Sequence, residues 1–211
     1  DFIAELARNW IALAHKGNAD KRIALILANY PTRDGRIGNG VGLDTPAAAL
    51  NILKALQQQG YPVAELPDSG TALIHQLLGG VTNDLDSLDA RPCAQSLALD
   101  EYLAFFHSLP AANQQAVRER WGEPEASSMV LRQGGQAVFV VPRLMLGKIA
   151  LLPQPSRGEK WEPKEKALYH SSSAWPSHYY LAAYLWAREQ QASDALVHFG
   201  THGSQEWLPG K

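Results

Sequence analysis

The sequence is poor in cysteine and in net charge, and both shortages exclude classes of protein. The single cysteine, Cys93, cannot form an intrachain disulfide, so the chain is no disulfide-stapled secreted scaffold and we expect a cytoplasmic location. Lys and Arg number 19 against 21 Asp and Glu, which gives a formal net charge of -2. No cluster of basic residues indicates a nucleic-acid or anionic-membrane partner, and we expect neither.

Long apolar runs and a phosphate-binding motif are also missing. The apolar run at residues 23–28 is far too short to span a bilayer and suits a buried strand. No G-x-x-x-x-G-K-[ST] pattern occurs, so we expect no ATP hydrolysis by this chain itself. Hydrophobic residues make up 45% of the 211 residues, which is enough to build a packed core.

An initiator methionine is missing as well. Residues 2–13 follow a helical pattern from the outset, and the last residues belong to a dense motif. We therefore expect these residues to be an internal piece of a longer polypeptide.

Apolar periodicity predicts an α/β fold made of two small α/β units of parallel-sheet character, joined by a helical segment. Residues 22–29 form a continuous apolar run, as expected for a strand covered on both faces. Thr45 is the expected N-cap of the next helix, with Pro46 in its first turn. A second strand over residues 61–66 and a helix over 69–78 would complete the first unit.

Further elements divide the rest of the chain. The predicted helices lie at residues 99–107, 113–121 and 176–190, and the predicted strands at 137–141, 149–152 and 195–199. The expected organisation is an α/β unit with a glycine-rich loop at 1–90, a helical segment at 91–131, and a second α/β unit at 132–211.

The glycine-rich loop, YPTRDGRIGNGVGLD at residues 30–44, is the first candidate for function. Its four glycines leave room for a ligand to approach the backbone N–H groups. Their order, G-x-x-G-x-G-x-G, does not fit the dinucleotide-binding fingerprint. From spacing alone, a structural crossover loop and a binding loop fit equally well.

The second candidate is the segment LVHFGTHGSQEWLPGK at residues 196–211, where His198, His202 and Glu206 recur at intervals of four. Two imidazoles and a carboxylate are suitable ligands for Co²⁺ or Zn²⁺. Gly200 and Gly203 argue against one continuous helix, so His198 should end a strand and the other two should lie on the following turn. That places them at the carboxyl end of a sheet, where α/β proteins bind ligands.

Two of the candidate histidines have a structural alternative. His198 lies in an apolar strand, where a hydrogen-bonded core histidine is slightly the better interpretation. His178 lies at the start of a helix, where it is either a base or a residue of the cap region. For His202 and Glu206, which lie among glycines, we favour a functional role.

Four stretches resemble successive blocks of one protein family. They read ANYPTRDGRIGNGVGLDTPAAALNILKAL (28–56), LPQPSRG (152–158), PSHYYLAAYLW (176–186) and VHFGTHGSQEWLPGK (197–211). These blocks resemble blocks of the family that contains the large cobaltochelatase subunit and its magnesium chelatase counterpart. Their order along the chain is also the same as in that family. Members of that family are much longer than this chain.

The resemblance implies a protein that binds a tetrapyrrole and inserts a divalent metal, with two smaller partner subunits, one an AAA+ ATPase that hydrolyses ATP. The substrates would be Co²⁺ and hydrogenobyrinic acid a,c-diamide; the alternative is Mg²⁺ and protoporphyrin IX. Imidazole ligands suit cobalt better than magnesium, and Thr201 and the LPGK ending resemble the cobalt members. We expect the isolated piece to be inactive.

The resemblance also suggests roles for the candidate residues. Glu206 would accept a proton or handle the metal, with His202 as its imidazole partner, and His198 and His178 would be further ligands or bases. The residues expected to bind the macrocycle's peripheral groups lie in the glycine-rich loop: Arg33, Asp34, Arg36, Gly38 and Gly40. Two other interpretations stay open, a zinc-dependent hydrolase built on the same motif and a non-catalytic scaffold domain.

Overall fold

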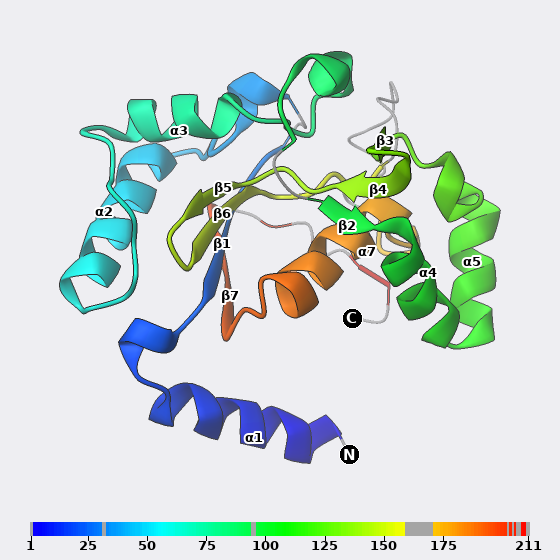
Figure 1. Cartoon of the computed structure of the whole chain (residues 1–211), viewed down its shortest axis with the longest axis horizontal. Helices are drawn as coiled ribbons and strands as arrows, with labels where there is room; N and C mark the ends of the chain where they lie inside the picture. Colours follow the sequence, from blue (N-terminus) through cyan, green and yellow to red (C-terminus); the bar gives the residue numbers. More distant parts are fainter. Residues whose placement is uncertain are drawn as a thin grey trace.

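The protein is described by a computed structural model with a four-stranded and a three-stranded sheet (Figure 1). The mixed α/β class predicted from the sequence is confirmed. The structure describes residues 2–30, 33–93, 96–158, 171–201, 203, 205 and 208–209, without the side chains of Ser87 and Asp89.

The larger sheet has the strand order β5-β6-β1-β7. Strand β1 (Ile23–Leu27) pairs in parallel with β6 (Ile149–Pro153) and with β7 (Ala195–Phe199), and β5 (Leu144–Leu146) pairs antiparallel with β6. All residues of β1 and β6 are buried, as their continuous apolar runs predict. Because β1 lies in the predicted first unit and its neighbours in the predicted second, the two units share one sheet.

Two helices cover one face of this sheet (Figure 1). They are α2 (Thr45–Gln58) and α3 (Gly70–Leu78), whose leucines join those of β1 and β6 in one buried cluster. The prediction of Thr45 as N-cap is wrong. Asp44 caps α2 instead, because its carboxylate accepts a hydrogen bond of 3.0 Å from the backbone N–H of Ala47.

The strand predicted at residues 61–66 is also wrong. The segment has no regular secondary structure and belongs to neither sheet. Pro62 lacks an N–H donor, and a strand ladder needs one at every second residue. Its carbonyl still accepts a hydrogen bond of 2.8 Å from the N–H of Lys148, which holds the segment beside the β5–β6 hairpin.

The opposite face is covered by α7 (His178–Leu185) and its π-helical continuation η5 (Trp186–Gln190). Behind α7 lies the second, antiparallel sheet, with the order β2-β4-β3, and α4 packs beside it (Figure 1). The elements of this layer are β2 (Ser96–Ala98), α4 (Leu99–Ser108), α5 (Ala111–Trp121), β3 (Val130–Gln133) and β4 (Gln136–Val140).

Helix α1 (Phe2–His15) stands apart from both layers and has no buried residue (Figure 1). Within the described part of the chain, every helix is too short or too polar to cross a bilayer. The other helices in the described part of the chain are short 3₁₀ segments: η1 (Asn18–Asp20), η2 (Asp34–Arg36), η3 (Leu85–Ala90) and η4 (Pro124–Ala126).

Candidate functional site

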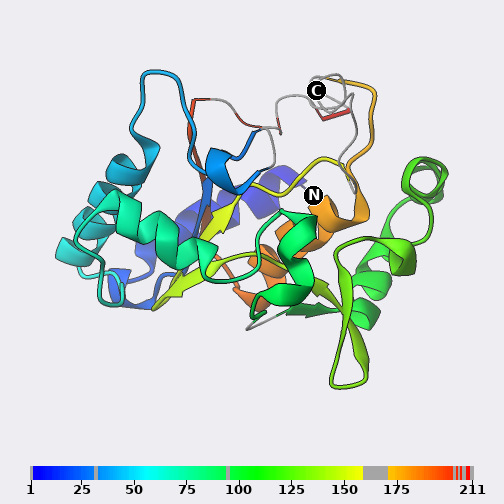
Figure 2. The same ribbon diagram turned by 90° about the horizontal axis from the view of Figure 1, so that it is seen from above.

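The two candidate segments meet at the carboxyl end of the parallel sheet. The glycine-rich loop leaves the end of β1 and residues 200–201 leave the end of β7, at the same edge (Figure 2). A Cβ on Gly40 would lie 3.2 Å from Cγ2 of Thr201 and 3.3 Å from Oγ1 of Thr45. Gly40 therefore lets the loop, the first turn of α2 and the segment after β7 come into contact.

Two more glycines shape this edge. A Cβ on Gly200 would collide with the Cβ of Ala28, so the chain leaves β7 close against β1 only with glycine there. A Cβ on Gly203 would lie 3.6 Å from Nε2 of Gln154, the residue that follows β6. Gly200 and Gly203 therefore lie beside the residues that follow β1 and β6, respectively.

Asp34, one of the expected ligand-binding residues, is held by partners within the chain. Its carboxylate accepts a hydrogen bond from Oγ1 of Thr82 at 2.5 Å and pairs with Nη2 of Arg91 at 2.6 Å. These contacts attach the glycine-rich loop to residues 81–91. Arg33 and Arg36 are exposed on the same loop, where they can reach a ligand's carboxylates.

The first turn of α2 points to the same edge but has no N–H group left for an anion. Asp44 accepts from the N–H of Ala47 with its side chain and from that of Ala48 with its carbonyl. The N–H of Thr45 donates to Leu43, and Pro46 has none. A ligand carboxylate near this turn would therefore depend on the loop arginines.

Three buried polar side chains at the edge were missed by sequence reasoning. Asn29 is 2% exposed, Thr45 0% and Gln154 3%. In the described part of the chain, both amide atoms of Asn29, Oγ1 of Thr45 and Oε1 of Gln154 have no hydrogen-bond partner. Buried polar atoms are nearly always paired, so unpaired ones grouped at a strand end indicate a place where a ligand or water binds. For Asn29 and Gln154 the signal is a polar residue that closely follows an apolar strand; Thr45, at the start of α2, has no such signal.

His198 is the predicted metal ligand that the structure places near the sheet edge. It lies near the end of β7, as predicted, but its side chain is only partly buried, so its interpretation as a core histidine is wrong. Its Nε2 lies 2.8 Å from the hydroxyl of Tyr184 on α7. Partial burial of the ring lowers the pKa of His198 below its ordinary value, which favours the neutral imidazole that can bind a metal or take a proton.

Tyr184 links α7 to His198 on β7. Burial and the neighbouring Tyr180 raise the pKa of Tyr184 far above its ordinary value, so its hydroxyl stays protonated. The protonated hydroxyl can donate to Nε2 of His198, and this hydrogen bond holds the histidine ring against α7.

His178 lies in the core, away from Tyr184 and His198. It is fully buried, its Nδ1 is 2.8 Å from the hydroxyl of Tyr102, and its Nε2 is 2.9 Å from the carbonyl of Gly122. The carbonyl needs an N–H donor, so Nε2 carries the proton and Nδ1 accepts from Tyr102. Both nitrogens are occupied, which favours a structural role over the predicted metal ligation.

His202 and Glu206, the predicted catalytic pair, lie outside the described residues. Among the described residues, no three His, Cys, Asp or Glu side chains gather closely enough to hold a metal ion. The predicted metal set thus has one described member near the edge, His198.

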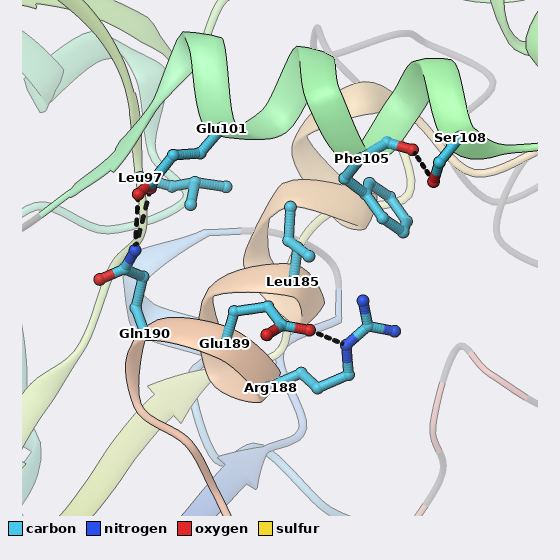
Figure 3. A pocket seen from close by; sticks show the side chains of 8 residues that line it. All are labelled: Leu97, Glu101, Phe105, Ser108, Leu185, Arg188, Glu189 and Gln190. Carbon is cyan, nitrogen blue, oxygen red and sulfur yellow. Dashed lines mark hydrogen bonds and ion pairs between the residues drawn. The ribbon is translucent and has the colours of Figure 1, made fainter.

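A shallow groove of about 290 Å³ lies elsewhere, between α4 and η5 (Figure 3). Its polar side chains bind one another: Nε2 of Gln190 donates to the carboxylate of Glu101, and Arg188 pairs with Glu189 at 2.7 Å. Because these polar groups are paired with one another, the groove is a weaker candidate for a ligand site than the sheet edge, where buried polar atoms are unpaired.

The parallel sheet, with the glycine-rich loop and residues 200–201 at the ends of its strands, defines an α/β protein. The sequence matches the CobN/Magnesium Chelatase family over residues 1–211, and the chain belongs to that family. The resemblance inferred from the four sequence blocks is thereby confirmed.

Relatives on both branches of the family are similar to the whole chain. It is 62% identical to the aerobic cobaltochelatase subunit CobN of Pseudomonas aeruginosa, with 100% of this chain and 16% of the relative covered. It is 32% identical to the large magnesium-chelatase polypeptide of Chlorobaculum parvum, with the same coverage. The chain spans about one sixth of the length of these relatives.

A solved structure has the same fold. The catalytic subunit of cobaltochelatase from Mycobacterium tuberculosis superposes with a TM-score of 0.81 at 38% sequence identity, covering 99% of this chain and 17% of the other.

Proposed function

We propose that this chain carries part of the macrocycle and metal site in the large subunit of an ATP-dependent cobaltochelatase. The substrates are Co²⁺ and hydrogenobyrinic acid a,c-diamide, and two smaller partner subunits, one of them an AAA+ ATPase, hydrolyse the ATP. The observation that carries this proposal is the meeting of the glycine-rich loop and the histidine motif over one sheet edge, at the contact between Gly40 and Thr201. Membership of the chelatase family supports the assignment of metal insertion to this edge.

Metal insertion sets three tasks for the protein. The macrocycle must lose two pyrrole N–H protons, the metal must lose water, and both must be held face to face. Glu206 takes a proton from the macrocycle, with His202 as its imidazole partner. His198, kept neutral by partial burial, offers a further nitrogen to the incoming ion.

The peripheral groups of the ring need separate contacts. Arg33 and Arg36 are exposed on the glycine-rich loop and suit carboxylates. The unpaired amide of Asn29 and the hydroxyl of Thr45 suit carboxamides, which both donate and accept hydrogen bonds.

The cobalt branch is better supported than the magnesium branch. Identity is 62% to the cobaltochelatase subunit of P. aeruginosa and 32% to the magnesium-chelatase polypeptide of C. parvum. A histidine near the strand end also suits cobalt, because magnesium prefers oxygen ligands and keeps its waters. Insertion of Mg²⁺ into protoporphyrin IX is the second candidate.

Fluorescence titration tests the proposal. Quenching of tryptophan fluorescence is followed as hydrogenobyrinic acid a,c-diamide, or separately protoporphyrin IX, is added to the full-length polypeptide and to residues 1–211. Each is prepared as wild type, as Glu206→Gln and as the surface control Glu65→Gln. We expect saturable binding of the corrinoid in all three full-length proteins, and loss of cobalt insertion with the partner subunits only in Glu206→Gln.

The other outcomes are equally informative. Tighter binding of protoporphyrin IX would assign the protein to the magnesium branch. If the full-length polypeptide binds neither ring, the proposal is wrong and the hydrolase or scaffold interpretation takes its place.

A further inference from the structure

The open edge of β7 is the first of two uncovered features. In the described sheet, β7 is the last strand and pairs only with β1. Strands of a parallel sheet are normally covered on both faces, as β1 and β6 are. Leu196 is 42% exposed and Val197 is 40% exposed. Because successive side chains of a strand point to opposite faces, β7 is only partly covered on both sides.

Helix α1 is the second uncovered feature. Its 14 residues include none that is buried. Phe2, Ile3, Leu6 and Trp10 fall on one side at helical spacing and are 46% to 77% exposed. Isolated helices of this length are marginal in water, so α1 needs a packing partner for this apolar stripe.

The two features adjoin each other. At the end of α1, Nζ of Lys16 pairs with the carboxylate of Asp194 at 2.8 Å, one residue before β7 begins. The same carboxylate accepts a hydrogen bond of 2.8 Å from the N–H of Arg22, just before β1. Asp194 therefore connects the C-terminal end of α1 to the start of β7, and the apolar stripe of α1 and the exposed side chains of β7 are together called the α1–β7 surface.

We propose that the α1–β7 surface is an interface within a longer polypeptide, where a further strand pairs with the open edge of β7 and apolar residues cover α1. The relatives supply the argument for this occupant. Relatives that contain this stretch are about six times its length, with 16% and 17% of two of them covered. Most of such a polypeptide is therefore available to pack here at high effective concentration.

The proposal rests on family membership and on packing, and it does not depend on the metal or macrocycle that the protein binds. An uncovered apolar strand edge would also promote aggregation, which proteins avoid by covering the edge.

Thiol labelling of the full-length polypeptide tests the proposal. Trp10→Cys and Val197→Cys are introduced singly into a Cys93→Ser background, with Glu119→Cys on the exposed side of α5 as the control. Peptide mass mapping gives the labelling rate at each site in the native protein. We expect Trp10→Cys and Val197→Cys to react at least roughly tenfold more slowly than Glu119→Cys, because labelling needs local opening.

Hydroxyl-radical footprinting of unmodified full-length protein provides the second measurement, since it needs no substitution. We expect Trp10 and Val197 to be protected while Val41, which is 94% exposed, is oxidised at its intrinsic rate. Equal reactivity at all sites would overturn the proposal. So would protection that disappears on dilution to monomers, which would assign the surface to a second copy, and so would a native polypeptide of only these 211 residues.

Discussion

His178 and His198 show how differently two histidines beside the same sheet are used. His178 is fully buried and hydrogen-bonded at both nitrogens, whereas His198 is only partly buried and bonded to Tyr184. Sequence analysis favoured a core role for His198 and left His178 undecided. Periodicity identifies which residues lie in a strand, but it does not say that β7 is an edge strand with open faces.

The pKa of His198 gives the first prediction. Because burial lowers its pKa in the folded protein below its ordinary value of 6.5, the unfolded chain takes up the proton first as the pH falls. The contribution of His198 to stability is therefore full above pH 6.5 and is lost as the pH drops below it. NMR titration should give a pKa for His198 below 6.5, and a higher value would contradict the structure.

The burial of His178 gives the second prediction. His178→Leu leaves the hydroxyl of Tyr102 and the carbonyl of Gly122 without a partner, so we expect a loss of about 2–4 kcal/mol in the free energy of unfolding. Urea denaturation measures this loss. The control His107→Gln, at an exposed position, should change stability by less than about 0.5 kcal/mol. A metal-ligand role would instead leave stability nearly unchanged.

At the scale of elements, the sequence predicted most of the parallel sheet and the helices on it. The strand predicted at 195–199 has the bounds of β7, and that predicted at 149–152 is one residue shorter than β6. Strands β2, β3 and β5 were missed because three or four residues are too few to show a period of two. The prolines near residues 61–66 are the signal that the wrong strand prediction overlooked.

The glycine-rich loop gives a prediction with a matched control. Gly40→Ala pushes the loop away from Thr201 and Thr45, whereas a Cβ on Gly35 meets nothing within 4 Å. We expect Gly40→Ala to weaken corrinoid binding by the full-length protein about tenfold, or about 1.4 kcal/mol, and Gly35→Ala to leave it unchanged. Fluorescence titration measures both. Equal affinities would show that contact between the two segments does not contribute to binding.

Capping of α2 gives another prediction at this scale. Asp44→Ala removes the hydrogen bond to the N–H of Ala47 and should cost about 1 kcal/mol of stability. Thr45→Val, which removes the hydroxyl at the predicted but unused cap position and keeps the shape of the side chain, should cost less. Thermal or urea denaturation distinguishes the two variants, and a larger loss for Thr45→Val would restore the sequence-based assignment of the cap.

At the scale of the whole molecule, the order of the strands was beyond prediction from the sequence. The ranges 1–90, 91–131 and 132–211 remain predictions as domain boundaries, yet strand pairing crosses from the first range to the third. An apolar run indicates that a strand is buried but does not identify its neighbours. The same limit applied to the candidate site. The glycine-rich loop and the segment 196–211 were both identified from the sequence, but the close approach of Gly40 to Thr201 was not.

The pairing of β1 with strands from residues 132–211 gives the last prediction. Residues 1–90 contain β1 but neither of its partners, so this piece expressed alone should lack the sheet and show poorly dispersed NMR amide signals. Residues 1–211 should show dispersed signals. A folded, cooperatively melting 1–90 piece would establish that range as an independent domain.

The position of β7 beside β1 has a consequence for the protein's synthesis. On the ribosome, β1 emerges more than a hundred residues before β6 and longer still before β7, so its two edges stay unpaired while most of the chain is made. The edge where Asn29, Gln154 and Thr201 meet cannot exist until the last strand has been inserted. If a ligand binds at this edge as proposed, a nascent chain cannot capture it before β7 has joined the sheet.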